Sequence, residues 1–171
     1  MLIIQTTVDQ RAMTALARAN RKTLRRGRSS PVRTLAWLVV ALEGFLTAVY
    51  LRGGQKDWPV NALLGLLMLG CLLLEDRVNG ALGLRRIPAA GREVNASFQE
   101  DSCYVCRSQA GEEWHPYSQI RAAAETEDYF VLLLGRGRGQ AYDKKGFTWG
   151  TPDEFRALIQ KKTGLKIEKI R

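Results

Sequence analysis

The chain has 171 residues, of which 25% are charged and 46% are hydrophobic, so its composition excludes both a disordered tract and a fibre. Three cysteines, one of them inside an apolar run, exclude a disulfide scaffold and suit a reducing compartment. The net charge of +9 is unevenly distributed, because charged residues are nearly absent from two runs, 35–51 and 59–74. This segregation favours a membrane protein over a soluble domain with well-mixed charges.

The N-terminal arm, residues 1–33, predicts a strand followed by a basic helix. Residues 2–8 alternate weakly and favour a short β-strand. Thr7 and Gln10 have the spacing of a capping box that opens a helix. An apolar stripe on this helix comprises Met13, Leu16, Ala17, Asn20 and Leu24. A basic stripe comprises Arg11, Arg18, Lys22 and Arg25. A basic amphipathic helix next to a membrane span suits an anionic inner leaflet.

Two apolar runs in residues 34–75 predict a transmembrane helical hairpin. The first, 34–51, has 18 residues and one charge, and as a helix it covers about 27 Å, close to the hydrocarbon thickness of a bilayer. The second, 59–74, has 16 residues and covers about 24 Å, which mild bilayer thinning accommodates. Trp37, Tyr50 and Trp58 lie where interfacial aromatic residues are expected. The alternative is a helical hairpin buried in a soluble domain.

The distribution of basic residues predicts the orientation of this hairpin. Residues 1–33 hold eight basic side chains against one acid, so eight minus one, or +7, of the net +9 precedes the first run. The loop between the runs carries only Arg52 and Lys56. The positive-inside rule therefore predicts both termini in the cytoplasm. The start of the chain shows no signal-peptide pattern.

Glu43 is the one ionisable residue at the middle of the first run, with Thr47 one turn along on the same face. A charge at this depth costs roughly 2.5–3.5 kcal/mol, so we expect Glu43 to be protonated, partnered or both. Gly65 is predicted at a similar depth on the second helix, and Gly44 with Ala48 forms a small-xxx-small pair suited to tight helix contact. Glu43 and Thr47 are a candidate intramembrane polar site, either for a hydrogen bond or for ion conduction in an oligomer.

The C-terminal domain, residues 93–171, follows a linker at 76–92 and predicts an antiparallel meander capped by one helix. The expected strands are 94–98, 103–107, 112–115, 120–127, 129–134 and 140–143, of which 129–134 is buried on both faces. Thr151, Pro152 and Glu154 open an amphipathic helix that Gly164 ends. This order of elements is that of a pleckstrin-homology-like (PH-like) half barrel. The expected fold class is an α+β membrane protein: a two-helix transmembrane hairpin with a cytosolic PH-like antiparallel half barrel.

The whole arrangement resembles the YcxB-like family of small bacterial membrane proteins. The residues that carry the resemblance are Trp114, Ile120, Glu125, 129–134, 143–147, 148–151 and Phe155. The resemblance implies a cytosolic PH-like domain on a two-helix anchor in the bacterial inner membrane, with no established activity or cofactor.

Two patterns in the C-terminal half are candidates for chemistry, but neither is complete. Cys103 and Cys106 have knuckle spacing, but a structural zinc needs four ligands and the chain has one histidine, His115. The glycine-rich segment 135–139 precedes a strand-like sequence rather than the helix that a phosphate loop requires. We therefore expect no enzyme activity, no metal and no cofactor, and we expect no nucleic acid partner because a reader motif is missing.

The predicted function is that of a non-enzymatic inner-membrane protein that presents a cytosolic interaction module to a protein partner or to anionic lipid. The candidate lipid-headgroup contacts are Arg18, Arg21, Lys22, Arg25, Arg136, Arg138, Lys144 and Lys145. The alternative is a subunit of an oligomeric channel or transporter that uses Glu43. A homo-oligomer is compatible with either hypothesis.

Overall fold

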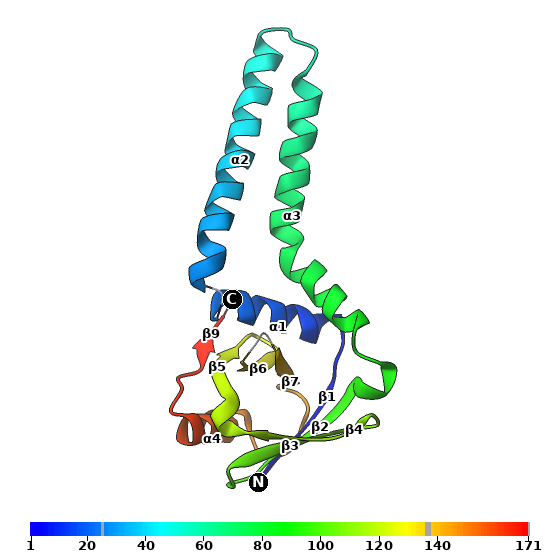
Figure 1. Ribbon diagram of the computed structural model, residues 1–171, viewed down its shortest axis with the longest axis vertical. Coiled ribbons are helices and arrows are strands. Elements are labelled where there is room, and N and C mark those ends of the chain that lie inside the picture. Colours follow the sequence, from blue (N-terminus) through cyan, green and yellow to red (C-terminus); the bar gives the residue numbers. More distant parts are fainter. Residues whose placement is uncertain (25, 136–137, 171) are drawn as a thin grey trace. The chain divides into compact units, whose positions relative to one another are not determined.

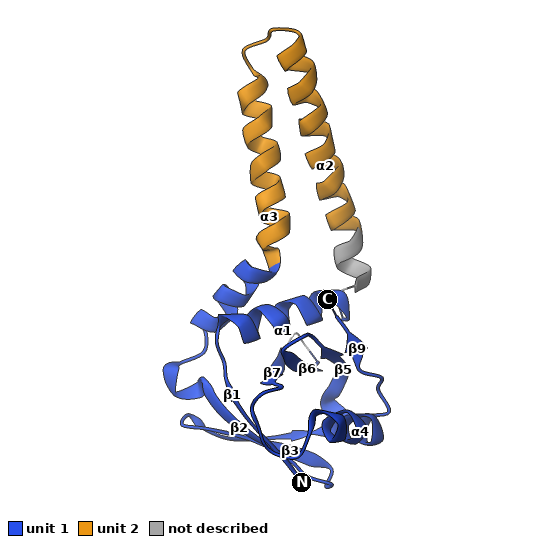
Figure 2. Ribbon diagram, turned by 180° about the vertical axis from the view of Figure 1, so that it is seen from behind, with its two compact units in different colours: residues 1–24, 76–171 blue, residues 25–75 orange. Residues whose placement is uncertain are grey.

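In a computed structural model, residues 1–24, 26–135 and 138–170 are described, with the backbone alone for 26–30. The chain divides into two units (Figure 2): unit 1 combines Met1–Leu24 with Asp76–Arg171, and unit 2 is Arg25–Glu75. The helices (Figure 1) are α1 (Gln10–Lys22), α2 (Arg26–Arg52), α3 (Trp58–Arg85) and α4 (Pro152–Thr163), with 3-10 turns at Ala89–Gly91 and Tyr117–Gln119. The strands are β1 (Leu2–Thr7), β2 (Glu93–Phe98), β3 (Cys103–Ser108), β4 (Gly111–Pro116), β5 (Ile120–Glu125), β6 (Tyr129–Leu134), β7 (Arg138–Asp143), β8 (Phe147–Trp149) and β9 (Glu168–Lys169).

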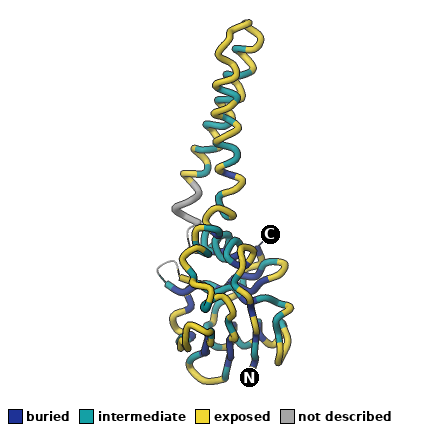
Figure 3. Tube along the Cα trace, turned by 90° about the vertical axis from the view of Figure 1, so that its right-hand side faces the viewer, coloured by how far each residue is buried: buried dark blue, intermediate teal, exposed yellow. Residues whose placement is uncertain are grey.

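Unit 2 is a helical hairpin made of α2 and the part of α3 that ends at Glu75. The segments Pro31–Arg52 and Trp58–Arg85 are long and apolar enough to cross a membrane, with 22 and 28 residues. Figure 3 shows that most of the hairpin is exposed, and the exposed side chains include many leucines and valines. The two predicted apolar helices are confirmed, although α2 begins at Arg26, before the predicted start at residue 34.

Unit 1 contains two β-sheets. Sheet A has the strand order β4-β3-β2-β1-β8 and is antiparallel throughout. Sheet B has the order β7-β6-β5-β9 and is antiparallel except where β9 pairs with β5. The described strands do not close into a barrel. The six predicted strands are present, but they form two three-stranded meanders rather than one, with β2 to β4 in sheet A and β5 to β7 in sheet B. Strand β1 lies between β2 and β8. The short strands β8 and β9 were not predicted from sequence.

Strand β6 explains how unit 1 is layered, because all six of its residues are buried. Phe130, Leu132 and Leu134 belong to the core between the two sheets, which also contains Phe155 of α4. Val131 and its alternate neighbours pack instead against α1 on the other face of sheet B. The expectation that 129–134 is buried on both faces is confirmed, and the layers run from α1 through sheet B and the core to sheet A (Figure 1).

Helix α1 differs from the sequence prediction in two ways. Thr7 is the last residue of β1, so the helix is capped by Asp9, whose carboxylate accepts a hydrogen bond from the Ala12 N–H at 2.7 Å. The predicted Thr7–Gln10 capping box is therefore wrong. The buried face consists of Ala12, Ala15 and Ala19 rather than the larger side chains of the predicted stripe. Alanines bring α1 close to sheet B, where a Cβ at Gly139 would lie 2.7 Å from a methyl carbon of Leu16.

The predicted linker at 76–92 begins as helix, because α3 continues to Arg85 and packs against α1. A Cβ at Gly80 would lie 2.8 Å from the backbone nitrogen of Thr14, so the two helices are in close contact there. Asp76 accepts two hydrogen bonds from the Arg21 guanidinium, at 2.8 and 2.6 Å. These contacts hold Asp76–Arg85 on the α1 side of unit 1.

The start and end of α4 are those expected from sequence. Thr151 and Glu154 form a reciprocal capping box, and Pro152 occupies the first turn. Gly164 ends the helix in the left-handed conformation with φ 68°. Phe155 and Ile159 bury the apolar face of α4 in the core between the sheets.

Candidate functional site

The outer face of sheet A carries a row of five side chains in register across all five strands, which we call the tryptophan row. Its members are Trp114, Val105, Ser97, Ile3 and Trp149, each paired with the next across adjacent strands. On β2 and β3 the residues that alternate with them, such as Phe98 and Tyr104, face the core, so the row faces away from it there. On β8 the register shifts between Ile3 and Ile4, so Phe147 packs against the core while the exposed Trp149 pairs with Ile3. With strands about 4.8 Å apart, the two ends of the row are about 19 Å apart.

The row is apolar and open at both ends. Trp114 is 61% exposed and Trp149 is 67% exposed, whereas Val105 between them is buried. Beside Trp114, Arg107 and Glu112 form an ion pair at 2.9 Å. Aromatic side chains surrounded by polar groups are typical of protein-binding surfaces rather than of stable solvated surface.

Strand β4, which carries Trp114, forms one edge of sheet A and pairs with β3 alone among the described strands. Its backbone polar groups on the outer edge are therefore open to pairing with another chain. Strand β8, at the opposite edge, has only three residues. The long open edge and one exposed tryptophan coincide at β4.

A polar cluster lies inside unit 1 on the side of β4 opposite Trp114. The Gln140 amide oxygen accepts hydrogen bonds from Tyr104 at 3.2 Å and from Tyr142, while its nitrogen lies 3.0 Å from Nε2 of His115. The Cys106 thiol contacts Gln140 and Tyr142 at 3.4 Å each. Burial raises the pKa of Cys106 to about 11, so the thiol is not a nucleophile at neutral pH. The cluster bridges the two sheets.

Glu125 is the buried acid of unit 1, and its ion pairs hold α4 to sheet B. Its carboxylate accepts hydrogen bonds from Arg156 at 2.9 and 2.7 Å. It also forms an ion pair with Lys144 at 2.7 Å. Both cations lie 5.3 Å from the centre of the Phe130 ring. Hydrogen bonds from Arg156, reinforced by Lys144, lower the pKa of Glu125 to about 2 against the opposing effect of burial.

The sequence-predicted lipid contacts do not converge on one surface. Arg21 is held by Asp76 at 2.6 Å, and Arg18 lies 3.7 Å from the same carboxylate. The ammonium group of Lys144 is bound to Glu125 and to the backbone oxygens of residues 126 and 127. Lys22 is half-buried on α1, and Arg138 and Lys145 are exposed. Arg25 and Arg136 lie outside the described residues.

The predicted intramembrane pair is only partly brought together. The Thr47 hydroxyl donates to the backbone oxygen of Glu43 at 2.7 Å, not to its carboxylate. A Cβ at Gly65 would lie 3.2 Å from the Cβ of Glu43, so the predicted approach of Gly65 is confirmed. Gly44 and Ala48 are exposed and face away from this contact. Glu43 Oε2 and Asn61 Nδ2 are buried and have no hydrogen-bond partner among the described residues.

The cysteines and His115 form no metal site in the part of the chain that the structure describes, where no three His, Cys, Asp or Glu side chains gather. The tryptophan row was missed at the sequence level, although Trp114 and residues 148–151 were singled out there. Its alignment depends on β8 pairing with β1, and the sequence does not indicate that a segment so short would pair with a strand at the other end of the chain.

No curated protein and no solved structure matches the chain. A family model does match within unit 1, over strands β3 to β8 and most of α4, where Trp114 and Glu125 lie. Residues 98–159 match the model of the family described as YcxB-like protein, which confirms over this part of the chain the resemblance inferred from sequence.

Proposed function

We propose that this chain is a non-enzymatic inner-membrane protein whose hairpin anchors a PH-like interaction module, unit 1, and that the module binds a protein partner through the tryptophan row. The observation that carries the proposal is the alignment of Trp114 and Trp149 on one face of sheet A, each more than half exposed. Tryptophans are enriched among the residues that contribute most to binding energy at protein interfaces.

Insertion of the hairpin into a membrane is supported by its length and its surface. Both helices expose large apolar side chains along their length. Water disfavours this much contiguous apolar surface, whereas lipid solvates it. The eight basic residues in 1–33 support a cytoplasmic position for both termini. A bacterial inner membrane is the location that the resemblance to the YcxB-like family implies.

The PH-like assignment is supported by two facing sheets and a C-terminal helix. Helix α4 places Phe155 and Ile159 in the core between the sheets, as expected of a half barrel with one side covered by a helix. The polar cluster gives His115 and Cys106 hydrogen-bond partners, and Arg156 and Lys144 pair with Glu125, so His115, Cys106 and Glu125 have structural roles.

Within unit 1, the row and the two junctions with the hairpin are on opposite sides. Unit 1 joins the hairpin after Leu24 and before Asp76, and both junctions are on the α1 side, since Asp76 is bonded to Arg21 of α1. The tryptophan row is on the opposite side of unit 1, beyond both sheets.

The test is site-specific photo-crosslinking of the full chain in its native membrane. A photoreactive phenylalanine analogue replaces Trp114 or Trp149, with the exposed positions Arg92 and Lys166 as matched controls off the row. We expect one protein adduct from both row positions, absent from both controls, and lost at position 149 when Trp114→Ala is added. Adducts that form equally at all four positions, or only with lipid, would contradict the proposal.

The channel alternative would depend on Glu43, which packs against Gly65 within the hairpin and shares no surface with the exposed Gly44. Ion leak or proton coupling that is altered by Glu43→Gln, while the photo-adducts are unchanged, would favour the channel. An adaptor instead requires that Glu43→Gln changes neither the ion leak nor the photo-adducts.

A further inference from the structure

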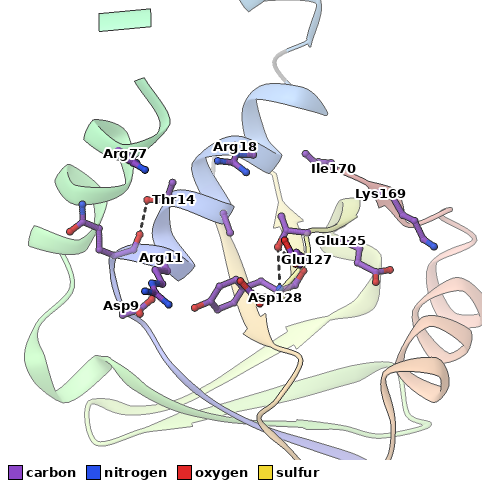
Figure 4. Close-up of a pocket in the computed structure, with 14 residues that line it drawn as sticks. Asp9, Arg11, Thr14, Arg18, Arg77, Glu125, Glu127, Asp128, Lys169 and Ile170 are labelled. Carbon is purple, nitrogen blue, oxygen red and sulfur yellow. Dashed lines mark hydrogen bonds between the residues drawn. The ribbon is translucent and has the colours of Figure 1, made fainter. Parts of the chain in front are cut away.

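Unit 1 has an open cleft of about 1130 Å³ on its α1 side (Figure 4). Its walls come from α1, from the α3 segment that packs on α1, from the turn between β5 and β6, and from β9. Tyr129 and Ile170 contribute buried side chains to its lining. The cleft is distinct from the tryptophan row, because the two sheets and the core lie between them.

The cleft is lined by charges of both signs that do not neutralise one another. Arg77 and Lys169 are exposed, as are Glu127 and Asp128. None of these four side chains makes an ion pair within the described residues. Unpaired charges of both signs around one cavity suit a ligand that itself carries both signs, whereas a polyanion would be repelled by the carboxylates.

The two signs are partly separated: the start of α1 contributes both Asp9 and Arg11, whereas the charges considered next come from different elements. Arg77 belongs to α3 and Arg18 to α1, and Figure 4 draws both along the upper edge of the cleft with Thr14 between them. Arg18 also lies 3.7 Å from Asp76. Glu127 and Asp128 belong to the turn between β5 and β6 and lie on the other side in the same view. A ligand that spans the cleft would therefore place its anionic group on the arginines and its cationic group on the carboxylates.

The arginine side is rigidly built. Asp76, the neighbour of Arg77, is fixed by two hydrogen bonds from Arg21, and Gly80 lies against the backbone of Thr14. These contacts fix the backbone of the α3 segment that carries Arg77. Tyr129 presents a phenol in the same cleft, and burial raises its pKa to about 12, so it remains a neutral hydrogen-bond donor.

Arg77 also lies at the depth of a lipid phosphate if the hairpin spans the membrane, because it follows the last residue of the apolar run, Leu74, by three positions. In an aminophospholipid the phosphodiester is attached to the glycerol and the ammonium is at the far end of the headgroup. The phosphodiester is therefore expected next to the segment that leaves the membrane, and the ammonium deeper in the cleft.

We propose that this cleft binds the headgroup of a zwitterionic aminophospholipid, with its phosphodiester on Arg77 and Arg18 and its primary ammonium on Glu127 and Asp128. The placement of the headgroup rests on the membrane insertion proposed above, but the binding does not depend on the tryptophan row or on any protein partner.

The test is native mass spectrometry of the delipidated full chain in mild detergent, titrated with phosphatidylethanolamine, phosphatidylcholine and phosphatidylglycerol. We expect one tightly retained phosphatidylethanolamine molecule and at least tenfold weaker retention of the other two lipids. Phosphatidylcholine keeps both charges, but its quaternary ammonium has no hydrogen to donate to the carboxylates. Phosphatidylglycerol has no ammonium.

Two variants separate the two ends of the headgroup. Arg77→Gln is expected to lower phosphatidylethanolamine retention at least tenfold, with partial recovery in Arg77→Lys. The double change Glu127→Gln and Asp128→Asn is expected to remove the preference for phosphatidylethanolamine over phosphatidylglycerol. Arg92→Gln and Glu93→Gln, which alter exposed charges outside the cleft lining, are the matched controls and are expected to behave as the unmodified chain does.

Three outcomes would overturn the proposal. The first is equal retention of the three lipids by the unmodified chain. The second is a loss of phosphatidylethanolamine retention in Arg92→Gln as large as in Arg77→Gln. The third is soluble phosphoethanolamine that binds as tightly as the lipid, which would identify a free metabolite as the ligand. The lipid-binding test uses protein purified without partners, so its result is independent of the crosslinking test of the tryptophan row. Either proposal can fail while the other stands.

Discussion

The two sheets of unit 1 differ in whether a helix covers their outer face. The outer face of sheet B is covered by α1, whose contact residues Ala12 and Ala19 are fully buried. The outer face of sheet A has no covering helix among the described residues: Val105 and Ser97 in the middle of the row are buried, but Trp114 and Trp149 at its ends are exposed. A sheet with two apolar faces needs cover on both, so the covered face contributes to folding and the uncovered face is left for binding. Substitutions on the covered side should therefore destabilise the protein, and those on the open side should not.

The largest effect is expected at Glu125, whose ion pairs with Arg156 and Lys144 hold α4 to the covered sheet. Glu125→Gln leaves two cations without their partner and is expected to cost about 3 kcal/mol of unfolding free energy. For a unit of this size that corresponds to roughly 10 °C in Tm. Thermal unfolding in detergent would measure it. Glu93→Gln, an exposed acid on β2, is the control and should change Tm little.

The same residue predicts a dependence on pH. The folded-state pKa of Glu125 is about 2, below its ordinary value of 4.5, so the unfolded chain binds a proton first as the pH falls. The stabilisation is complete above about pH 4.5 and is lost as the pH falls toward 2. Glu125→Gln should therefore flatten the fall in Tm between pH 5 and about pH 3. An unchanged slope in the variant would show that other carboxylates carry the acid sensitivity.

The next effect is expected at the contact between α1 and sheet B. Ala12 is fully buried there, so Ala12→Leu overpacks the contact and is expected to cost about 2 kcal/mol. Ala17→Leu on the same helix is the control, because Ala17 is outside this contact cluster. The apolar stripe inferred from sequence, which includes Ala17 and omits Ala12, predicts the opposite order. The Tm values of the two variants would therefore distinguish the two assignments of the buried face.

Helix α1 also shows how far the sequence could predict the fold. Periodicity predicted a helix after the segment 7–10, and Leu16 of the predicted apolar stripe does pack at this contact. The stripe missed the buried Ala12, Ala15 and Ala19, because the close approach to β6 and β7 selects small side chains. Local chemistry was more reliable at α4, where Thr151, Pro152 and Gly164 define both ends without reference to the rest of the chain. Strand β8 depends on a partner more than 140 positions away, and no local signal indicates it.

In the candidate sites, too, single residues could be recognised from sequence, whereas their arrangement depends on distant parts of the chain. Trp114 could be singled out from sequence, but its alignment with Trp149 requires the register of five strands. The cleft charges Arg77 and Glu127 are 50 positions apart and are brought to one cavity only by the packing of α3 on α1. Basic residues could be counted from sequence, whereas the carboxylates that already bind Arg21 and Lys144 could not be identified.

The hairpin repeats the contrast between covered and open positions on a smaller scale. A Cβ at Gly65 lies 3.2 Å from Glu43, whereas no described atom is within 4 Å of a Cβ at Gly44. Gly65→Leu is expected to weaken helix packing by about 1 kcal/mol, and Gly44→Leu is expected to have no effect. Unfolding by titration with a denaturing detergent would compare them. A greater cost at Gly44 would instead place a second copy of the chain on that exposed face.

The smallest effect on stability is expected on the open face of sheet A. Trp114→Ala and Trp149→Ala remove side chains that are mostly exposed, so each should change the free energy of unfolding by less than about 0.5 kcal/mol. The same variants are expected to abolish the partner adduct, which makes binding and folding separable at this face. If either variant instead lowers Tm as much as Ala12→Leu does, that tryptophan covers sheet A as α1 covers sheet B. The row would then contribute to the fold, and the surface left for a partner would be the edge of β4.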